Sequence, residues 1–395
     1  MPHIYQLDET ASRTADEAAR LAAEKIAPNA VETDRLGTFP TTSLAALRQA
    51  GWLGLTLPAE IGGRGQGPGA FAAVVEAIAE ACPSTAMIYV MHVSAVQALV
   101  ASTSLADRDS ILREVAAGRH LTTLAFSERG SRSQFWAPVS QLERNGEGFR
   151  VNAHKSWVTS ANHADSHVSS VQQPGATNPS ESTLFLLSSH ADGVKTVATY
   201  DGLGLRGNDS APVEYTDVAV AAGDLLTEQG AAMSTMLEIV LPWFVVGTSA
   251  MANGICRAAT AATAQHLVNT EFQNDHSKLR DLPNLRSRLA EMHLCTEQSR
   301  AILGYTVQCM AQPDELTPLY VLQSRNAALQ AASHVTDLAM KACGGAAFSK
   351  QLGIERLFRD ARAGWVMAPT VDHLRDFVGR ALTGLPLFDP TPDNV

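Results

Sequence analysis

Three segments of the sequence carry residue types that could do chemistry. The first, over residues 125–161, holds an indole and several hydroxyls, those of Trp157, Ser127, Ser133 and Thr159. Hydroxyls can donate hydrogen bonds to a group that gains negative charge, and an indole can shield such a group from water. Taken alone, the segment could be only a turn, and Trp157 could be only a core aromatic residue on a strand.

The other two segments are rich in glycine and charge. One is GLGLRGNDSAPVEYTDVAV over residues 202–220, and the other is KACGGAAFSKQLGIERLFRDAR over residues 341–362. A glycine pair such as Gly344-Gly345 lets a backbone approach a ligand closely, because no Cβ stands in the way. Each segment by itself could be only a turn or a charged helix end.

Signatures of several other chemistries are missing from the sequence. The 12 histidines include no HExxH motif, and no Cys/His pair has ligand spacing, so no metal site is predicted. No GxSxG elbow, P-loop or GxGxxG after a strand occurs. The five cysteines are scattered and lack CxxC spacing, which argues against a disulfide framework and favours a reducing cytoplasm.

The predicted secondary structure that must position these segments changes along the chain. Helical periodicity dominates the start, and short alternating runs separated by turn residues predict strands from Leu121 to about Leu226. Long stretches rich in Ala and Leu then follow. We predict a helical domain over residues 1–120, a β domain over residues 121–228 and a second helical domain over residues 229–395.

Composition and charge exclude several kinds of partner. The 395 residues carry 30 Lys and Arg against 40 Asp and Glu, a formal net charge of −10, which argues against nucleic acid. The stretch 239–256 lacks charge, but its Pro242, Gly247 and Asn253 favour a buried helix over a membrane span. The first residues contain no apolar signal segment. We therefore expect a soluble, cytoplasmic protein that does not bind membranes.

Jointly, and in this order, the three segments resemble the acyl-CoA dehydrogenase superfamily. The resemblance extends from DRLGTFP (34–40) and GWLGLTLPAEIGG (51–63) to the final helix. It implies an α+β fold with an N-terminal helical domain, a middle β-barrel or sandwich and a C-terminal four-helix bundle. It also implies FAD as cofactor, an acyl-CoA as substrate and a homodimer or homotetramer.

The resemblance assigns flavin contacts to the first segment. Ser127 and Ser133 match the family's hydroxyls that face flavin and substrate. Trp157 matches the aromatic wall, and Thr159 matches the hydroxyl donor near flavin N5. Glu128 occupies a family-wide position, for which we expect a structural role.

Further flavin contacts are implied near the end of the chain. Lys341 stands where the family usually has Gln, Gly344 and Gly345 form the glycine turn, and Thr370 matches a hydroxyl near the flavin's phosphates. Asn269 replaces an Arg through which many members bind the partner subunit's FAD. We therefore expect FAD binding that is present but weaker than in ordinary members.

The general base of the family is missing from both positions that could hold it. The usual glutamate, which removes the α-proton of the thioester, is Ala368, and the alternative position is Phe244. His92 is a candidate replacement, although a histidine on an apolar helix is more often a hydrogen-bonded core residue. Asp372 and His373 are further candidates, for which surface roles are favoured.

The leading interpretation is a FAD-dependent oxidoreductase that acts on an acyl-CoA thioester by non-standard chemistry. Its electrons would pass to an electron-transfer flavoprotein. One alternative is a flavin-dependent monooxygenase that uses O2 and is supplied by a flavin reductase, because the final helix (367–388) resembles that branch. A further alternative is a non-catalytic subunit of a heteromeric dehydrogenase.

Overall fold

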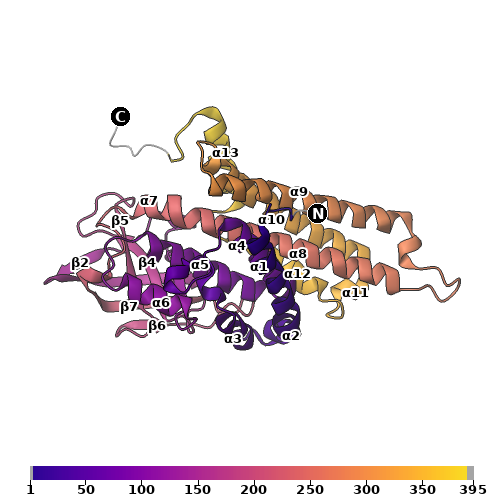
Figure 1. Ribbon diagram of the computed structural model, residues 1–395, viewed down its shortest axis with the longest axis horizontal. Coiled ribbons are helices and arrows are strands. Elements are labelled where there is room, and N and C mark those ends of the chain that lie inside the picture. Colours follow the sequence, from indigo (N-terminus) through magenta and orange to yellow (C-terminus); the bar gives the residue numbers. More distant parts are fainter. Residues whose placement is uncertain (1–2, 389–395) are drawn as a thin grey trace.

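The chain begins with a layer of helices (Figure 1). The structure is a computed structural model that describes residues 3–388. The helices of this layer are α1 (Glu9–Leu21), α2 (Ala27–Leu36), α3 (Thr41–Gln49), α4 (Pro68–Ala81), α5 (Pro83–Ala101) and α6 (Arg108–Ala116). Proline opens α4 and α5, since the first amide of a helix needs no partner within it. Both helices are apolar and largely buried, which makes them the core of the layer.

Two sheets follow the helical layer. The first has the order β1 (Thr122–Ala125), β4 (Ser166–Gln172), β5 (Ser182–Ser188), with β1 parallel to β4. The second is antiparallel, in the order β2 (Leu142–Asn145), β3 (Gly148–Val158), β7 (Ala211–Val220), β6 (Val194–Thr196). Side chains from both sheets share one core, including Val151, Phe185 and Val213. The middle sheet domain is therefore present as expected.

Long helices form the last part of the chain. They are α7 (Ala232–Ser234), the π-helical turn η5 (Thr235–Val240), α8 (Leu241–Asn269), α9 (Pro283–Ala311), α10 (Thr317–Cys343), α11 (Gly345–Phe348), α12 (Ile354–Val366) and α13 (Val371–Thr383). Helices α8, α9 and α10 lie side by side, and α12 packs on α8 and α10 to complete a bundle (Figure 1). The predicted domain boundaries fall in the connections before β1 and before α7 and stay predictions.

Two helical stretches are long and apolar enough to cross a membrane by length and composition alone. They are Pro83–Ala101 and Ala232–Asn269, with mean hydropathies of 1.4 and 1.5. In each, 83% of the apolar window is buried inside the fold, which is the usual state of a core helix. The uncharged stretch 239–256 thus lies in a buried helix, as its composition predicted.

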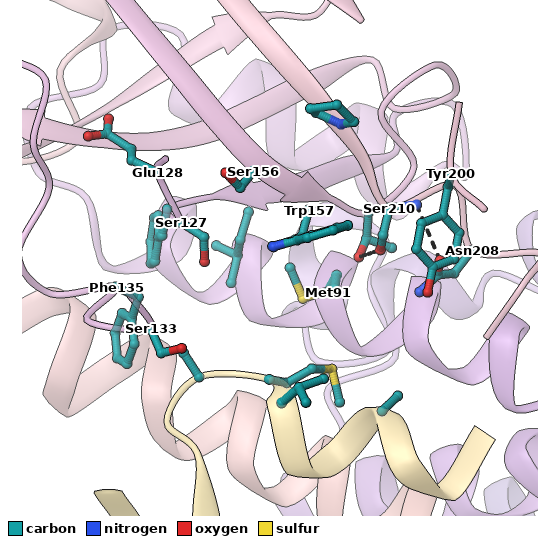
Figure 2. A pocket seen from close by; sticks show the side chains of 18 of the residues that line it. Met91, Ser127, Glu128, Ser133, Phe135, Ser156, Trp157, Tyr200, Asn208 and Ser210 are labelled. Atoms are coloured by element: carbon teal, nitrogen blue, oxygen red, sulfur yellow. Dashed lines mark hydrogen bonds between the residues drawn. The ribbon is translucent and has the colours of Figure 1, made fainter. Parts of the chain in front are cut away.

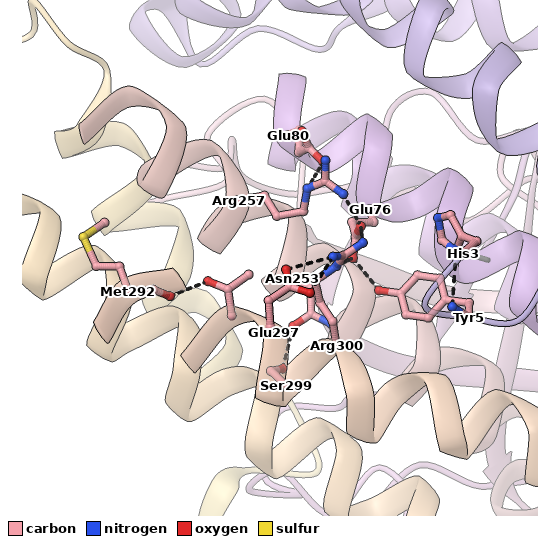
Figure 3. A network of polar contacts seen from close by, with 11 residues as sticks. His3, Tyr5, Glu76, Glu80, Asn253, Arg257, Met292, Glu297, Ser299 and Arg300 are labelled. Carbon is pink, nitrogen blue, oxygen red and sulfur yellow. Dashed lines mark hydrogen bonds and ion pairs between the residues drawn. The ribbon is translucent and has the colours of Figure 1, made fainter. Parts of the chain in front are cut away.

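One buried carboxylate joins the start of the chain to the bundle (Figure 3). Glu76 of α4 accepts hydrogen bonds from Arg300 Nε at 3.1 Å and Nη2 at 3.0 Å, and from Arg257 Nη1 at 3.0 Å. It also accepts one from the hydroxyl of Tyr5. Because Arg257 belongs to α8 and Arg300 to α9, this network fixes the helical layer against the bundle.

Candidate active site

A cavity of about 910 Å³ lies where the three domains meet (Figure 2). Its walls come from α5, the loop after β1, the end of β3, the loop before β7, the start of α8 and the end of α12. Representative lining residues from these six elements are Met91, Ser127, Trp157, Asn208, Phe244 and Val366. The cavity depends on all three domains, so no single segment of the sequence could define it.

The structure brings four of the predicted flavin contacts together in this cavity, namely Ser127, Ser133, Trp157 and Thr159. Within residues 3–388, the hydroxyls of Ser127 and Ser133 make no hydrogen bond to the protein, so both can bind a ligand. Thr159 Oγ1 lies 2.9 Å from Ser210 Oγ. One of these two hydroxyls donates to the other, which leaves the second proton for an acceptor in the cavity.

Trp157 is an exposed residue that lines the cavity, and the alternative of a core aromatic is wrong. Its exposed fraction is 68%, and its backbone has φ 56°, a left-handed conformation that a bulky residue rarely adopts. The pairing of β3 with β7 shifts register between Lys155 and Val158, so the strand bulges at this position. The bulge turns the indole towards the cavity, where its face suits a planar ring.

A buried ion pair fixes the loop that carries the serines. Lys155 Nζ lies 2.7 Å from Glu128 Oε1 and 2.5 Å from the Ser170 carbonyl oxygen. Glu128 Oε2 accepts hydrogen bonds from the amides of Val139 and Ser140 at 2.6 and 2.7 Å. Burial opposes the charge of Glu128, but Lys155 and the two amides outweigh it and lower the pKa of this carboxyl. Glu128 therefore holds the loop and is not a free base.

His92, the candidate base, is a core residue in the structure. Its Nδ1 accepts from the Thr122 amide at 3.1 Å, and its Nε2 donates to the Leu53 carbonyl at 3.1 Å. Burial lowers the pKa of His92 to about 4, so the ring is neutral near pH 7. It does not line the cavity. Both ring nitrogens serve the backbone, which fits the hydrogen-bonded core residue that the sequence favoured and not the candidate base.

The residues just after Ala368 also lie outside the cavity lining. The hydroxyl of Thr370 caps α13 by accepting from the His373 amide at 3.4 Å. The His373 ring packs edge-on against Trp136, 5.7 Å away between centroids, and Asp372 is exposed. In this chain Thr370 thus has a helix-capping role, and neither Asp372 nor His373 reaches the cavity.

The two positions that the resemblance assigned to the family's base both line the cavity. Ala368 and Phe244 are lining residues, and neither side chain can accept a proton. The carboxylates in the lining are Glu128, which is paired as described, and Asp201. The Asp201 side chain is 87% exposed and lies 3.2 Å from Arg206. In the described part of the chain, the cavity therefore has no buried carboxylate free to act as base.

An arginine that the sequence did not single out lies behind this wall. The Arg325 guanidinium carbon is 4.8 Å from the centroid of the Phe244 ring, and its Nη2 donates to the Met367 carbonyl at 3.1 Å. In the sequence it looks like an ordinary charge on an amphipathic helix. Tyr200, Asn208 and Ser210 also line the cavity; the latter two lie in the glycine-rich segment 202–220 that pointed to a site.

Lys341, Gly344 and Gly345 lie at the C-terminal end of α10, outside the cavity lining. Helix α10 rises ~1.5 Å per residue, so Lys341 is about 24 Å along the helix from Arg325. Its Nζ lies 2.6 Å from Asp337, and Gly344 has φ 55° and ψ −132°, a conformation suited to glycine. These residues share one end of the bundle with the end of α8 (Figure 1). They do not line the cavity, and their predicted contact with FAD stays a prediction.

Comparison with known proteins identifies the family. Three models match in order: "Acyl-CoA dehydrogenase, N-terminal domain" over residues 8–119, "middle domain" over 123–218 and "C-terminal domain" over 240–383. The chain belongs to the acyl-CoA dehydrogenase family. Members of this family are flavin-dependent oxidoreductases, and FAD is the cofactor that membership indicates. The open hydroxyls and the exposed indole of the cavity fit such a group.

Individual relatives of this family align with almost the full length of the chain. A cyclohex-1-ene-1-carbonyl-CoA dehydrogenase of Geobacter metallireducens is 25% identical over 381 residues, covering 96% of this chain and 99% of the relative. A 3-sulfinopropanoyl-CoA desulfinase of Paraburkholderia xenovorans is 25% identical over 385 residues, covering 96% and 98%. The solved butyryl-CoA dehydrogenase of Megasphaera elsdenii has a TM-score of 0.90 at 20% identity, covering 95% and 99%.

The described residues offer no site for a metal ion. Between residues 3 and 388, no group of three or more His, Cys, Asp or Glu side chains is placed to hold one.

Proposed function

We propose that this protein binds FAD and an acyl-CoA thioester in the cavity and acts on the thioester without a carboxylate base. The observation that carries the proposal is the cavity wall itself. Ala368 and Phe244, which line the cavity, stand at the two positions that the resemblance assigns to the base, while Glu128 is held by Lys155 and two amides. The chemistry therefore differs from removal of an α-proton by a glutamate.

The residues that would hold the cofactor are those with open donors and an exposed ring. Ser127, Ser133 and the Thr159–Ser210 pair would donate hydrogen bonds, and Trp157 would cover the ring face. Bound FAD supplies a two-electron acceptor at this place. Asn269 lacks the charge of the usual Arg, so we expect affinity about one to two decades below that of ordinary members.

Family membership alone does not determine the reaction, as two relatives illustrate. The dehydrogenase of Geobacter and the desulfinase of Paraburkholderia are equally similar to this chain, at 25% identity, yet they are named for different reactions. In this proposal the electrons pass to an electron-transfer flavoprotein or to O2. Lys341, Gly344 and Gly345 would contact FAD bound by a second copy in a homodimer or homotetramer. A cytoplasmic location belongs to the same proposal.

Anaerobic spectroscopy of the FAD-loaded protein tests this function. The protein is titrated with a panel of acyl-CoA thioesters under argon, and O2 uptake is then measured with the same panel. We expect the thioesters to bind and to perturb the flavin spectrum, without release of the α,β-unsaturated product. Efficient release of that product with an artificial electron acceptor would show a dehydrogenase that uses another base.

The same experiment separates the remaining alternatives. O2 uptake that depends on the thioester and yields an oxygenated product would identify a monooxygenase. A protein that takes up no FAD at millimolar cofactor, or contains only FMN, would contradict the flavoenzyme proposal and favour a non-catalytic subunit.

A further inference from the structure

Arg325 of α10 is a fully buried cation. Its exposed fraction is 0%, and it is among the largest side chains that are wholly enclosed. Taking a guanidinium out of water is costly unless carboxylates or other acceptors surround it. Proteins retain such groups where they pair with an opposite charge or serve a ligand.

Few groups of the protein offset the cost of burying the Arg325 guanidinium. Its Nη2 donates to the Met367 carbonyl at 3.1 Å, and the ring of Phe244 faces the guanidinium. Nε and Nη1 are buried and have no hydrogen-bond partner within the described chain. No carboxylate of residues 3–388 pairs with it, and burial, which is unopposed by any anion, lowers the pKa of Arg325 to about 9. Two donor nitrogens and one positive charge therefore lack a partner in the described chain.

The partners that Arg325 does have are both walls of the cavity. Phe244 and Met367 line it, and each is only partly buried. The guanidinium thus lies one side chain behind the surface that the substrate meets. A phenylalanine ring and a flexible methionine are side chains that can move aside with little strain.

We propose that Arg325 binds a carboxylate on the acyl chain of the substrate, reached when the Phe244 ring turns aside. The inference rests on the proposed function and names its substrate class, a thioester of a dicarboxylic acid. In the bound state the carboxylate replaces the aromatic ring as the partner of the cation. Arg325 Nη1, which has no partner within residues 3–388, then donates to the carboxylate, and the charge of the guanidinium makes this hydrogen bond charge-assisted.

Calorimetric titration of the FAD-loaded protein with matched thioesters tests the inference. The probes are succinyl-CoA against butyryl-CoA, glutaryl-CoA against pentanoyl-CoA, and adipyl-CoA against hexanoyl-CoA. We expect the carboxylate-bearing member to bind about tenfold to a hundredfold tighter at one chain length or more, as a charge-assisted hydrogen bond allows. Arg325→Met should abolish this preference by weakening only the carboxylate-bearing member, and Arg325→Lys should retain part of it.

Arg64 offers a matched control. Its guanidinium also stacks on an aromatic ring, that of Trp52 at 5.2 Å, but it does not line the cavity. Arg64→Met should leave the preference unchanged. The inference is overturned if the wild-type protein binds the uncharged member equally well or better at every length, or if the preference survives in Arg325→Met. If Arg325→Met does not fold, the titration of the wild-type protein still tests the inference, because equal binding of the two members at every length would contradict it.

The outcomes also separate this inference from the proposed function. If thioesters bind without a preference for the carboxylate, only the role of Arg325 is wrong. If the FAD-loaded protein binds no thioester, the proposed function fails and the inference fails with it.

Discussion

Trp157 is the residue whose exposure and backbone most directly indicate a ligand. A left-handed backbone at a non-glycine residue costs ~1–3 kcal/mol, and here the bulge holds an indole away from the core. We predict that Trp157→Ala leaves the unfolding free energy of the protein without cofactor almost unchanged. FAD affinity should fall about tenfold to a hundredfold. The apolar surface that the indole buries against the cofactor would contribute ~1.5–3 kcal/mol to binding, and the variant loses it.

A fluorescence titration with FAD and a thermal melt of the same samples measure both quantities. Trp52 is the matched control, since its exposed fraction is 1%. Trp52→Ala should cost ~3–5 kcal/mol of stability, as large-to-small core changes do. If Trp157→Ala destabilises the protein to a similar degree while FAD affinity is normal, the proposed role of Trp157 is wrong.

Ala368 allows a direct test of the missing base. We predict that Ala368→Glu restores little or no desaturation, although a positioned carboxylate base typically contributes ~10²–10⁴-fold. The reason is Arg325, which donates to the carbonyl of the preceding residue and has unpaired donors nearby. Such a cation would pair with the new carboxylate and weaken it as a base.

The measurement is desaturation of an acyl-CoA with a dye as electron acceptor. The double variant Ala368→Glu/Arg325→Met should exceed the single variant, because its carboxylate lacks the ion-pair partner. Full activity in the single variant, without O2 uptake by the parent protein, would instead indicate a dehydrogenase that has only lost its glutamate.

At the scale of elements, Asp360 couples α12 to the loop that forms one wall of the cavity. Its Oδ1 accepts from the amide of Leu205, a lining residue, at 2.6 Å. Burial raises the pKa of Asp360 to about 7, so the folded protein holds a proton that the unfolded chain releases. The stabilisation from this carboxyl is therefore complete below about pH 4 and is lost as pH rises through about 7.

Asp360→Asn tests this coupling, because the amide keeps an acceptor for Leu205 and cannot ionise. We predict that the variant gains stability relative to the wild-type protein as pH rises from 5 to 8. The gain should be a few kcal/mol at most, since one pKa unit corresponds to ~1.4 kcal/mol. Thermal melts across this range measure it, with the exposed Asp372→Asn as control. A constant difference between Asp360→Asn and the wild-type protein would contradict the prediction.

At the scale of the whole molecule, the Glu76 network holds the start of the chain on the bundle. Tyr5 is 2% exposed and donates its hydroxyl to this carboxylate. We predict that Tyr5→Phe lowers the free energy of unfolding by ~1.5–3 kcal/mol, the usual contribution of a hydrogen bond to a charged group. Urea unfolding measures the loss. Tyr305→Phe, at a position 49% exposed on α9, should change little. Equal losses in the two variants would show that the network does not anchor the start of the chain.

Local sequence patterns determined much of this molecule. Helical and strand periods depend on neighbours within a few residues, so the order of helices, sheets and helices could be read directly. The family resemblance of one short segment singled out Ser127, Ser133, Trp157 and Thr159, and these four residues line one cavity. The family match covers the same order of domains.

Tertiary packing decided which of the remaining residues face the cavity. His92 lies in an apolar run of the sequence and is enclosed by two backbone groups, whereas Trp157 lies in a strand and is exposed by a bulge. Lys341 lies at the far end of a long helix, a distance that motif spacing does not reveal. The isolation of Arg325 depends on α8 and on the chain after α12. Contacts between elements so distant in the sequence exist only once the chain has packed, so no local pattern could predict them.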